Sequence, residues 1–164
     1  SFNYRIDNND IYYFSNMYIK FGSIITKTLF ESLGVLRYGV LVATSASLGT
    51  KNIGELDIDN DPRIMNVYSD DISNIFRCDS NGNSNNNGTH YLWNAKVEIP
   101  GVAANFTKGL HAVAYVINAK GDYLLLDEKV TSVTDLAKEY QLDACYSSLD
   151  NGAKSALDYL ASLR

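Results

Sequence analysis

The segment 110–117 carries apolar side chains at both sets of alternating positions, with His111 as the exception. Successive side chains of a β-strand point to opposite faces, so a strand with this pattern meets little water on either side. The pattern therefore predicts a central strand of a sheet. The turn-forming residues 118–122 follow, and a second apolar run begins at Tyr123, which predicts a hairpin that returns beside the first strand.

Residues 91–99 alternate between apolar and polar side chains, which predicts a half-buried strand with Trp93 on the core face. Together with the hairpin, it would bring three adjacent strands together near Trp93 and Tyr115. Further strands are expected over 17–25 and 37–42, and the glycine of the latter, Gly39, suits a close backbone contact or a bulge. Shorter extended pieces are predicted within residues 3–14, on both sides of a polar turn, and at 64–68.

The pattern changes to a helical period after residue 131. Ser132 and Asp135 form a capping-box pattern ahead of a first helix, and a second helix is predicted from Leu149 or Asp150 to Leu163. Each has an apolar stripe that needs a surface to cover. We expect both helices to pack on the protein's own core, while docking of the last helix on a partner is the alternative.

The overall composition is that of an ordinary globular protein: 164 residues, 46% hydrophobic and 20% charged. This length fits one domain with its own core. No apolar run approaches the roughly 20 residues that cross a bilayer, so no membrane insertion is expected. The first residue is Ser1 rather than Met, and we expect a processed product or a piece of a longer protein.

The net charge of −5 is spread over the chain without a basic cluster. Nucleic-acid affinity comes mainly from clustered cations, so a nucleic-acid partner is not expected. Cys78 and Cys145 form no CxxC pattern and are interpreted as unpaired thiols, with a disulfide between them as the alternative. No cofactor and no metal is expected.

One acidic loop resembles the start of a calcium loop, because the carboxylates of Asp57, Asp59 and Asp61 fall at alternate positions. Pro62 stands where such a loop needs glycine, and Tyr68 stands where a bidentate glutamate is expected. A solvated acidic loop is therefore the preferred interpretation.

The familiar catalytic templates are absent from the sequence, including the nucleophile elbow, the P-loop and the zinc-protease motif. His90 and His111 are the only neutral-pH bases, and neither has an evident motif partner. We expect no enzyme and no catalytic residues. That expectation would change if either histidine lay within hydrogen-bond reach of both a carboxylate and a nucleophile.

A contact surface is the functional feature that the sequence suggests. Twelve tyrosines are present, and tyrosine combines an apolar body with a polar tip at low entropy cost. Tyr12, Tyr13 and Phe14 are predicted to form a displayed patch, although aromatic residues also pack in strands. The loop 79–88 is rich in asparagine and has nothing to bury, so Asn85 and Asn86 are predicted to be exposed contact residues.

Several short segments, in this order, resemble a family of immunoglobulin-like β-sandwich modules in large surface proteins of low-GC Gram-positive bacteria and in structural proteins of their phages. They are residues 38–42, 114–116, 121–123, 132–137 and 157–161. The chain departs from the family at Val113, where the family tends to have an arginine before the Ala-Tyr pair. The resemblance implies a mainly β protein, an immunoglobulin-like antiparallel β-sandwich over 1–130 with a C-terminal helical appendage over 131–164.

The function that the resemblance implies is that of a non-enzymatic structural or adhesion module. Its expected location is a phage virion, as a capsid, head-fibre or tail component, or a bacterial cell surface. Its expected partners are other subunits of that assembly, or a protein or glycan of the host surface. The alternative is a carbohydrate-binding module, with exposed tyrosines stacking on sugar rings and the Asn-rich loop supplying hydrogen bonds.

Overall fold

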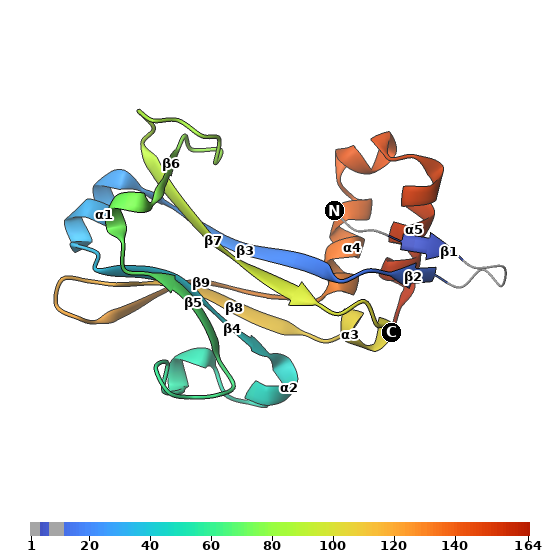
Figure 1. Ribbon diagram of the computed structural model, residues 1–164, viewed down its shortest axis with the longest axis horizontal. Coiled ribbons are helices and arrows are strands. Elements are labelled where there is room, and N and C mark those ends of the chain that lie inside the picture. Colours follow the sequence, from blue (N-terminus) through green and yellow to red (C-terminus); the bar gives the residue numbers. More distant parts are fainter. Residues whose placement is uncertain (1–3, 7–11) are drawn as a thin grey trace. The chain divides into compact units, whose positions relative to one another are not determined.

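The computed structural model describes residues 4–6 and 12–164, with side chains from Phe14 onward (Figure 1). This part of the chain is a mixed α/β protein, with 36% strand and 31% helix and with two antiparallel sheets. The sequence predicted a mainly β protein; the fold class is mixed instead, because short helices also occupy the connections between strands.

Seven strands form the two sheets. The three-stranded sheet has the order β3–β7–β6, with β3 at Met17–Thr26, β7 at His90–Ile99 and β6 at Phe76–Cys78. The four-stranded sheet has the order β5–β4–β8–β9, with β5 at Met65–Ser69, β4 at Arg37–Thr44, β8 at Leu110–Ile117 and β9 at Tyr123–Thr131. The sequence predicted two short extended pieces in this segment, and the strands β1 (Tyr4–Ile6) and β2 (Tyr12–Phe14) are present and pair antiparallel.

Helices lie between the strands and at the C-terminal end. The α-helices are α1 (Lys27–Leu33), α2 (Ser45–Leu48), α3 (Ala103–Phe106), α4 (Val133–Gln141) and α5 (Asn151–Ser162). The 3-10 turns are η1 (Ile53–Glu55), η2 (Ile72–Asn74) and η3 (Ala144–Ser148).

The contacts of the chain divide it into two compact units, described separately below. Unit 1 comprises Ser1–Ile19, Lys96–Leu110 and Val130–Arg164, and unit 2 comprises Lys20–Ala95 and His111–Lys129. The helices α4 and α5 thus belong to the same unit as the chain around α3. The predicted division into a sandwich over 1–130 and a helical appendage over 131–164 is not tested by these units and stays a prediction.

The centre of unit 2 is β8, which lies between β4 and β9. Its residues from Ala112 to Val116 are all buried, with 0–6% of each exposed. A strand with two hydrogen-bonded neighbours and apolar side chains on both faces is a central strand, as the pattern at 110–117 predicted. The predicted hairpin to β9 is also present.

Trp93 lies on the buried face of β7, as predicted, with 5% of its surface exposed. Its indole Nε1–H donates a hydrogen bond to the backbone oxygen of Gly39 at 2.9 Å. The prediction of three adjacent strands near Trp93 and Tyr115 is wrong, because β7 pairs with β3 and β6 whereas β8 belongs to the other sheet. The connection 100–109 contains α3 and is long enough to lead from one sheet to the other.

The outer face of the four-stranded sheet is covered by the segment that follows β4. Leu48, Ile53 and Leu56 are buried there and pack in one cluster with Leu41 and Tyr115. The segment has no regular apolar pattern in the sequence, yet each such buried side chain contributes about 1.5–3 kcal/mol of hydrophobic free energy. It is irregular in backbone but forms part of the core.

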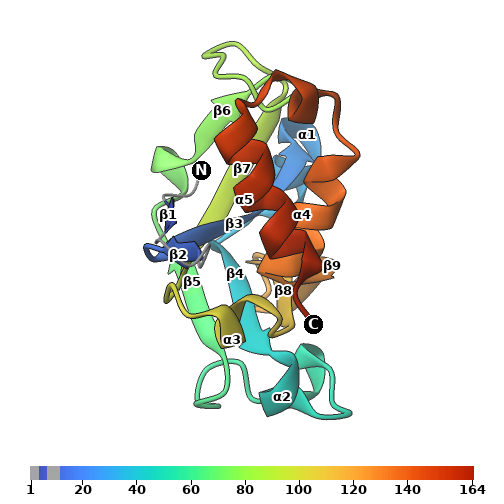
Figure 2. The same cartoon turned by 90° about the vertical axis from the view of Figure 1, so that its right-hand side faces the viewer.

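In unit 1, α4 and α5 lie side by side (Figure 2). Ser132 Oγ accepts from the Asp135 backbone N–H at 3.0 Å, and an Asp150 carboxylate oxygen accepts from the Ala153 N–H at 2.7 Å. These caps satisfy N–H groups that a helix leaves free at its start. The apolar stripe of α5 is buried, as predicted: Ala156, Leu157, Leu160 and Ala161. The last helix therefore packs within its own chain.

Candidate functional site

The Asn-rich loop between β6 and β7 has a defined conformation held by its own polar groups. An Asp79 carboxylate oxygen accepts from the backbone N–H of Asn81 at 2.9 Å and of Asn83 at 3.0 Å. These bonds favour the ionised carboxylate and lower the pKa of Asp79. The Arg77 guanidinium donates from Nε to the Gly88 backbone oxygen at 2.7 Å and so ties the two ends of the loop together.

Asn85 and Asn86 are exposed on this loop, as the sequence predicted. The Asn85 side-chain oxygen accepts from the backbone N–H of Asn87 at 2.9 Å, and its backbone oxygen accepts from Gly88 at 3.0 Å. The side chain of Asn86 takes no part in these bonds and is exposed to solvent. The loop therefore presents polar side chains from a fixed backbone.

Of the three residues in the predicted aromatic patch, only Phe14 has a side chain that the structure describes. Tyr12 and Tyr13 lie in β2, and their side chains are outside the described ones. Phe14 is only 9% exposed, with its ring edge-on to Phe106 at 5.5 Å and stacked on Tyr159 at 5.9 Å. Its ring is part of the unit 1 core, so its assignment to a displayed patch is corrected: rings from α3 and α5 cover it.

Among the described residues, each histidine ring has one side-chain hydrogen-bond partner. His111 Nδ1 lies 2.7 Å from Glu128 Oε1, across β8 and β9, and His90 Nδ1 lies 2.8 Å from the hydroxyl oxygen of Thr89. Among the described residues, no hydrogen bond joins either ring to both a carboxylate and a nucleophile. The arrangement that would favour an enzyme, a histidine bonded to a carboxylate and to a nucleophile, is therefore not found at either ring in the described part of the chain.

The carboxylates of the acidic loop are directed to donors of the protein itself. Asp61 pairs with Arg63 at 2.7 Å, and the hydrogen bonds from Arg63 lower the pKa of Asp61 to about 2. An Asp59 carboxylate oxygen accepts from the hydroxyl of Tyr123 at 2.5 Å, while Asp57 accepts from Asn60 Nδ2 at 3.1 Å. In the described residues, no three His, Cys, Asp or Glu side chains are placed to hold a metal ion.

Both cysteines are free. Cys78 is buried at the end of β6, and burial raises the pKa of its thiol. Cys145 is exposed in η3, where a hydrogen bond with Asp143 raises its thiol pKa. Raised pKa values mean that both thiols are protonated and poorly nucleophilic at neutral pH.

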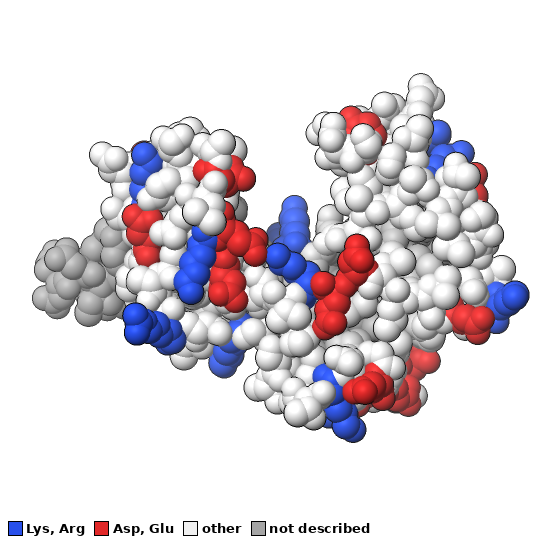
Figure 3. Space-filling model, turned by 180° about the vertical axis from the view of Figure 1, so that it is seen from behind, with Lys and Arg blue, Asp and Glu red and all other residues white. Residues whose placement is uncertain are grey.

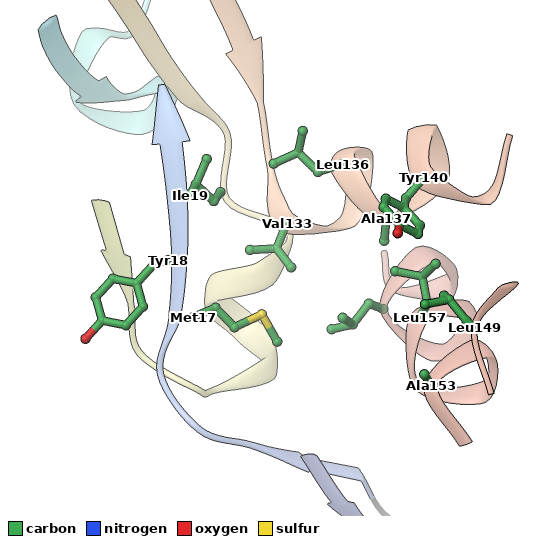
Figure 4. A pocket seen from close by; sticks show the side chains of 11 residues that line it. Met17, Tyr18, Ile19, Val133, Leu136, Ala137, Tyr140, Leu149, Ala153 and Leu157 are labelled. Carbon is green, nitrogen blue, oxygen red and sulfur yellow. The ribbon is translucent and has the colours of Figure 1, made fainter. Parts of the chain in front are cut away.

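Unit 1 contains an apolar groove of about 400 Å³ (Figure 4). Met17 and Ile19 of β3 point into it, opposite Val133 and Leu157 from the two helices, whereas Tyr18 points to the other side of the strand. The lining residues are Met17, Tyr18, Ile19, Val133, Leu136, Ala137, Tyr140, Leu149, Ala153, Leu157 and Leu160. The helical stripes were readable in the sequence, but the space left between them depends on how the segments pack.

Charge is distributed without a dominant sign on the face shown in Figure 3, where Lys and Arg side chains are interspersed with Asp and Glu. Such a surface has no strong field to steer a polyanion. Among the described residues, no helix is both long and apolar enough to cross a membrane.

Comparisons with protein-family models, with curated proteins and with solved structures found no match to this chain.

Proposed function

We propose that this chain is a non-enzymatic structural or adhesion module with an immunoglobulin-like sandwich architecture. Its location is a phage virion or a bacterial cell surface, and its partners are other subunits of that assembly or a protein or glycan of the host surface. The two antiparallel sheets and the order of the motifs in the sequence support the architecture.

The observation that carries the functional part is the internally braced Asn-rich loop. Its backbone is fixed by hydrogen bonds to Asp79 and Arg77, while the side chains of Asn85 and Asn86 are exposed. Ordering a flexible loop costs free energy when a partner binds, and a loop that is already ordered avoids most of that cost. A polar, preformed loop on a rigid sheet is therefore well suited to contact a partner.

The test is binding of the fluorescently labelled chain to low-GC Gram-positive cells and to purified virions of their phages. The double variant N85A/N86A is expected to reduce binding at least about tenfold, which corresponds to about 1.4 kcal/mol. The loss combines the contacts of both amides with the bond inside the loop between Asn85 Oδ1 and the Asn87 N–H. Ser155→Ala, an exposed change on α5, is the matched control and should bind as the unmodified chain does. Equal binding by the double variant and the control, or no binding to any of these surfaces, would refute the proposal.

A carbohydrate-binding module is the second candidate function. Exposed aromatic side chains in unit 2 favour it, with Tyr68 51% and Phe76 44% exposed. In this candidate function, Tyr12 and Tyr13 stack on sugar rings and the Asn-rich loop supplies hydrogen bonds. Glycan-array binding that disappears in the variant Y12A/Y13A would support this function, and silence across a broad array would leave the structural role.

A further inference from the structure

A shallow hollow lies at the start of β6 in unit 2. Its volume is about 340 Å³, and it is lined by Tyr38, Asn74, Phe76, Leu92, Trp93 and Asn94. Sites for small molecules have volumes of roughly 300–1,000 Å³ and combine mainly apolar walls with a few polar groups. Three aromatic rings, one leucine and two primary amides fit that description, and none of the lining side chains is charged.

Phe76 provides an exposed aromatic face on this hollow. It pairs in register with Leu92 between β6 and β7, so the two side chains lie directly opposite each other on one face of the sheet. Phe76 is 44% exposed and Leu92 is half-buried. The phenyl ring is thus flanked by apolar surface and still open to a ligand.

Two amides stand beside this ring. Asn94 is two residues beyond Leu92 on β7, so its side chain lies on the same face, and Asn74 ends η2 two residues before Phe76. Both are exposed, and neither side-chain amide has a hydrogen-bond partner among the described residues. Each amide offers two N–H donors and one oxygen acceptor.

The walls of the hollow are held in place by bonds to the backbone. The Trp93 indole donates to the Gly39 oxygen, and the Tyr38 hydroxyl donates to the Asp71 oxygen at 3.5 Å. The Tyr38 and Trp93 rings are 5.7 Å apart between centroids. These bonds place the rings before any ligand arrives, which reduces the entropic cost of binding.

Gly22 of β3 is not one of the residues that line the hollow, but it lies beside one of them, Asn94. A Cβ atom added there would lie 3.4 Å from the Cβ of Asn94, so any longer side chain at position 22 would extend beside the Asn94 amide. With glycine, this amide is accessible from the β3 side.

We propose that this hollow binds one neutral pyranose ring of a glycan. A pyranose has an apolar C–H face, which packs on the ring of Phe76, and a rim of hydroxyl groups, which the amides of Asn74 and Asn94 can both donate to and accept from. The inference rests on the proposed adhesive function and names the class of ligand, but it places the sugar at β6 and β7 rather than at Tyr12 and Tyr13.

The test is a titration of the ¹⁵N-labelled full chain with the methyl glycosides of glucose, galactose, mannose and N-acetylglucosamine, followed by NMR. The concentration reaches roughly 50 mM, where a site with a dissociation constant near 1 mM is filled. With at least one glycoside we expect saturable shifts of the side-chain amides of Asn74 and Asn94 and of the Trp93 indole N–H. Phe76→Ala is expected to weaken binding at least about tenfold, and Phe76→Tyr, which keeps the aromatic face, to retain it.

Tyr68→Ala is the matched control, because Tyr68 is also an exposed aromatic residue of unit 2 but lies outside the hollow. It should leave the titration unchanged, and so should Y12A/Y13A. Absence of shifts with all four glycosides, or equal binding by Phe76→Ala and the unmodified chain, would overturn the inference. Those results would leave the cell-binding effect of N85A/N86A untouched, so the sugar site and the adhesive function can fail separately.

Discussion

Replacement of Gly39 by alanine tests the packing at the centre of unit 2. A Cβ at this position would lie 2.7 Å from the backbone oxygen of Val67, 2.8 Å from a ring carbon of Tyr115 and 2.9 Å from the Cβ of Tyr68. All three distances are shorter than a carbon atom tolerates. Val67 and Tyr68 belong to β5, the paired neighbour of β4, so relief of the clash requires the two strands to separate.

The expected cost follows from two opposing effects. Overpacking in a filled core costs about 1–3 kcal/mol, while alanine in a strand regains roughly 0.5–1 kcal/mol relative to glycine. Because the nearest atom is backbone and cannot turn away, the clash dominates, and we expect a net loss of about 2 kcal/mol. For a protein of this size, that lowers the melting temperature by about 4–8 °C.

The measurement is thermal unfolding followed by circular dichroism, with Gly54→Ala as the matched control. A Cβ at position 54 meets only the end of the Leu125 side chain, at 3.0 Å, and that side chain can rotate. The control should unfold within about 0.5 kcal/mol of the unmodified chain. A Gly39→Ala variant as stable as the control would show that β5 is not packed against β4 in this way.

Three further predictions concern unit 1 and the response to pH. Leu160→Ala, at a position 2% exposed, should lower the free energy of unfolding by about 2–5 kcal/mol. Leu142→Ala, at a position 90% exposed, is the control and should change it by less than about 0.5 kcal/mol. Equal effects of the two variants in chemical denaturation would contradict the packing of α5. Ala153→Leu should fill part of the apolar groove and raise the melting temperature, and a lower value would mean that the groove is not free to accept a larger side chain. Burial, followed by the hydrogen bond to Asp59, raises the pKa of Tyr123 from 10 to about 12, so the stability it contributes is complete below pH 10 and is lost as the pH rises toward 12. An ultraviolet titration in which Tyr123→Phe removes a phenol that ionises near pH 10 would refute this.

The sequence by itself determined the local elements. The run at 110–117, apolar on both faces, identified the central strand β8, and the alternation at 91–99 placed Trp93 on the buried face. The capping-box pattern at Ser132 located the start of α4, and the apolar stripe that follows Asp150 predicted α5. These features depend on residues within a few positions of one another, so the period of apolar side chains and the capping chemistry are sufficient to reveal them.

Only the tertiary structure decided which elements meet. It assigned β7 and β8 to different sheets, placed Leu48 and Ile53 over the outer face of one sheet, and covered Phe14 with rings from α3 and α5. It also joined Phe76 and Asn94 in one hollow. Burial is a property of partners that are distant in the sequence, and an apolar or aromatic residue has the same local pattern whether a partner covers it or solvent does.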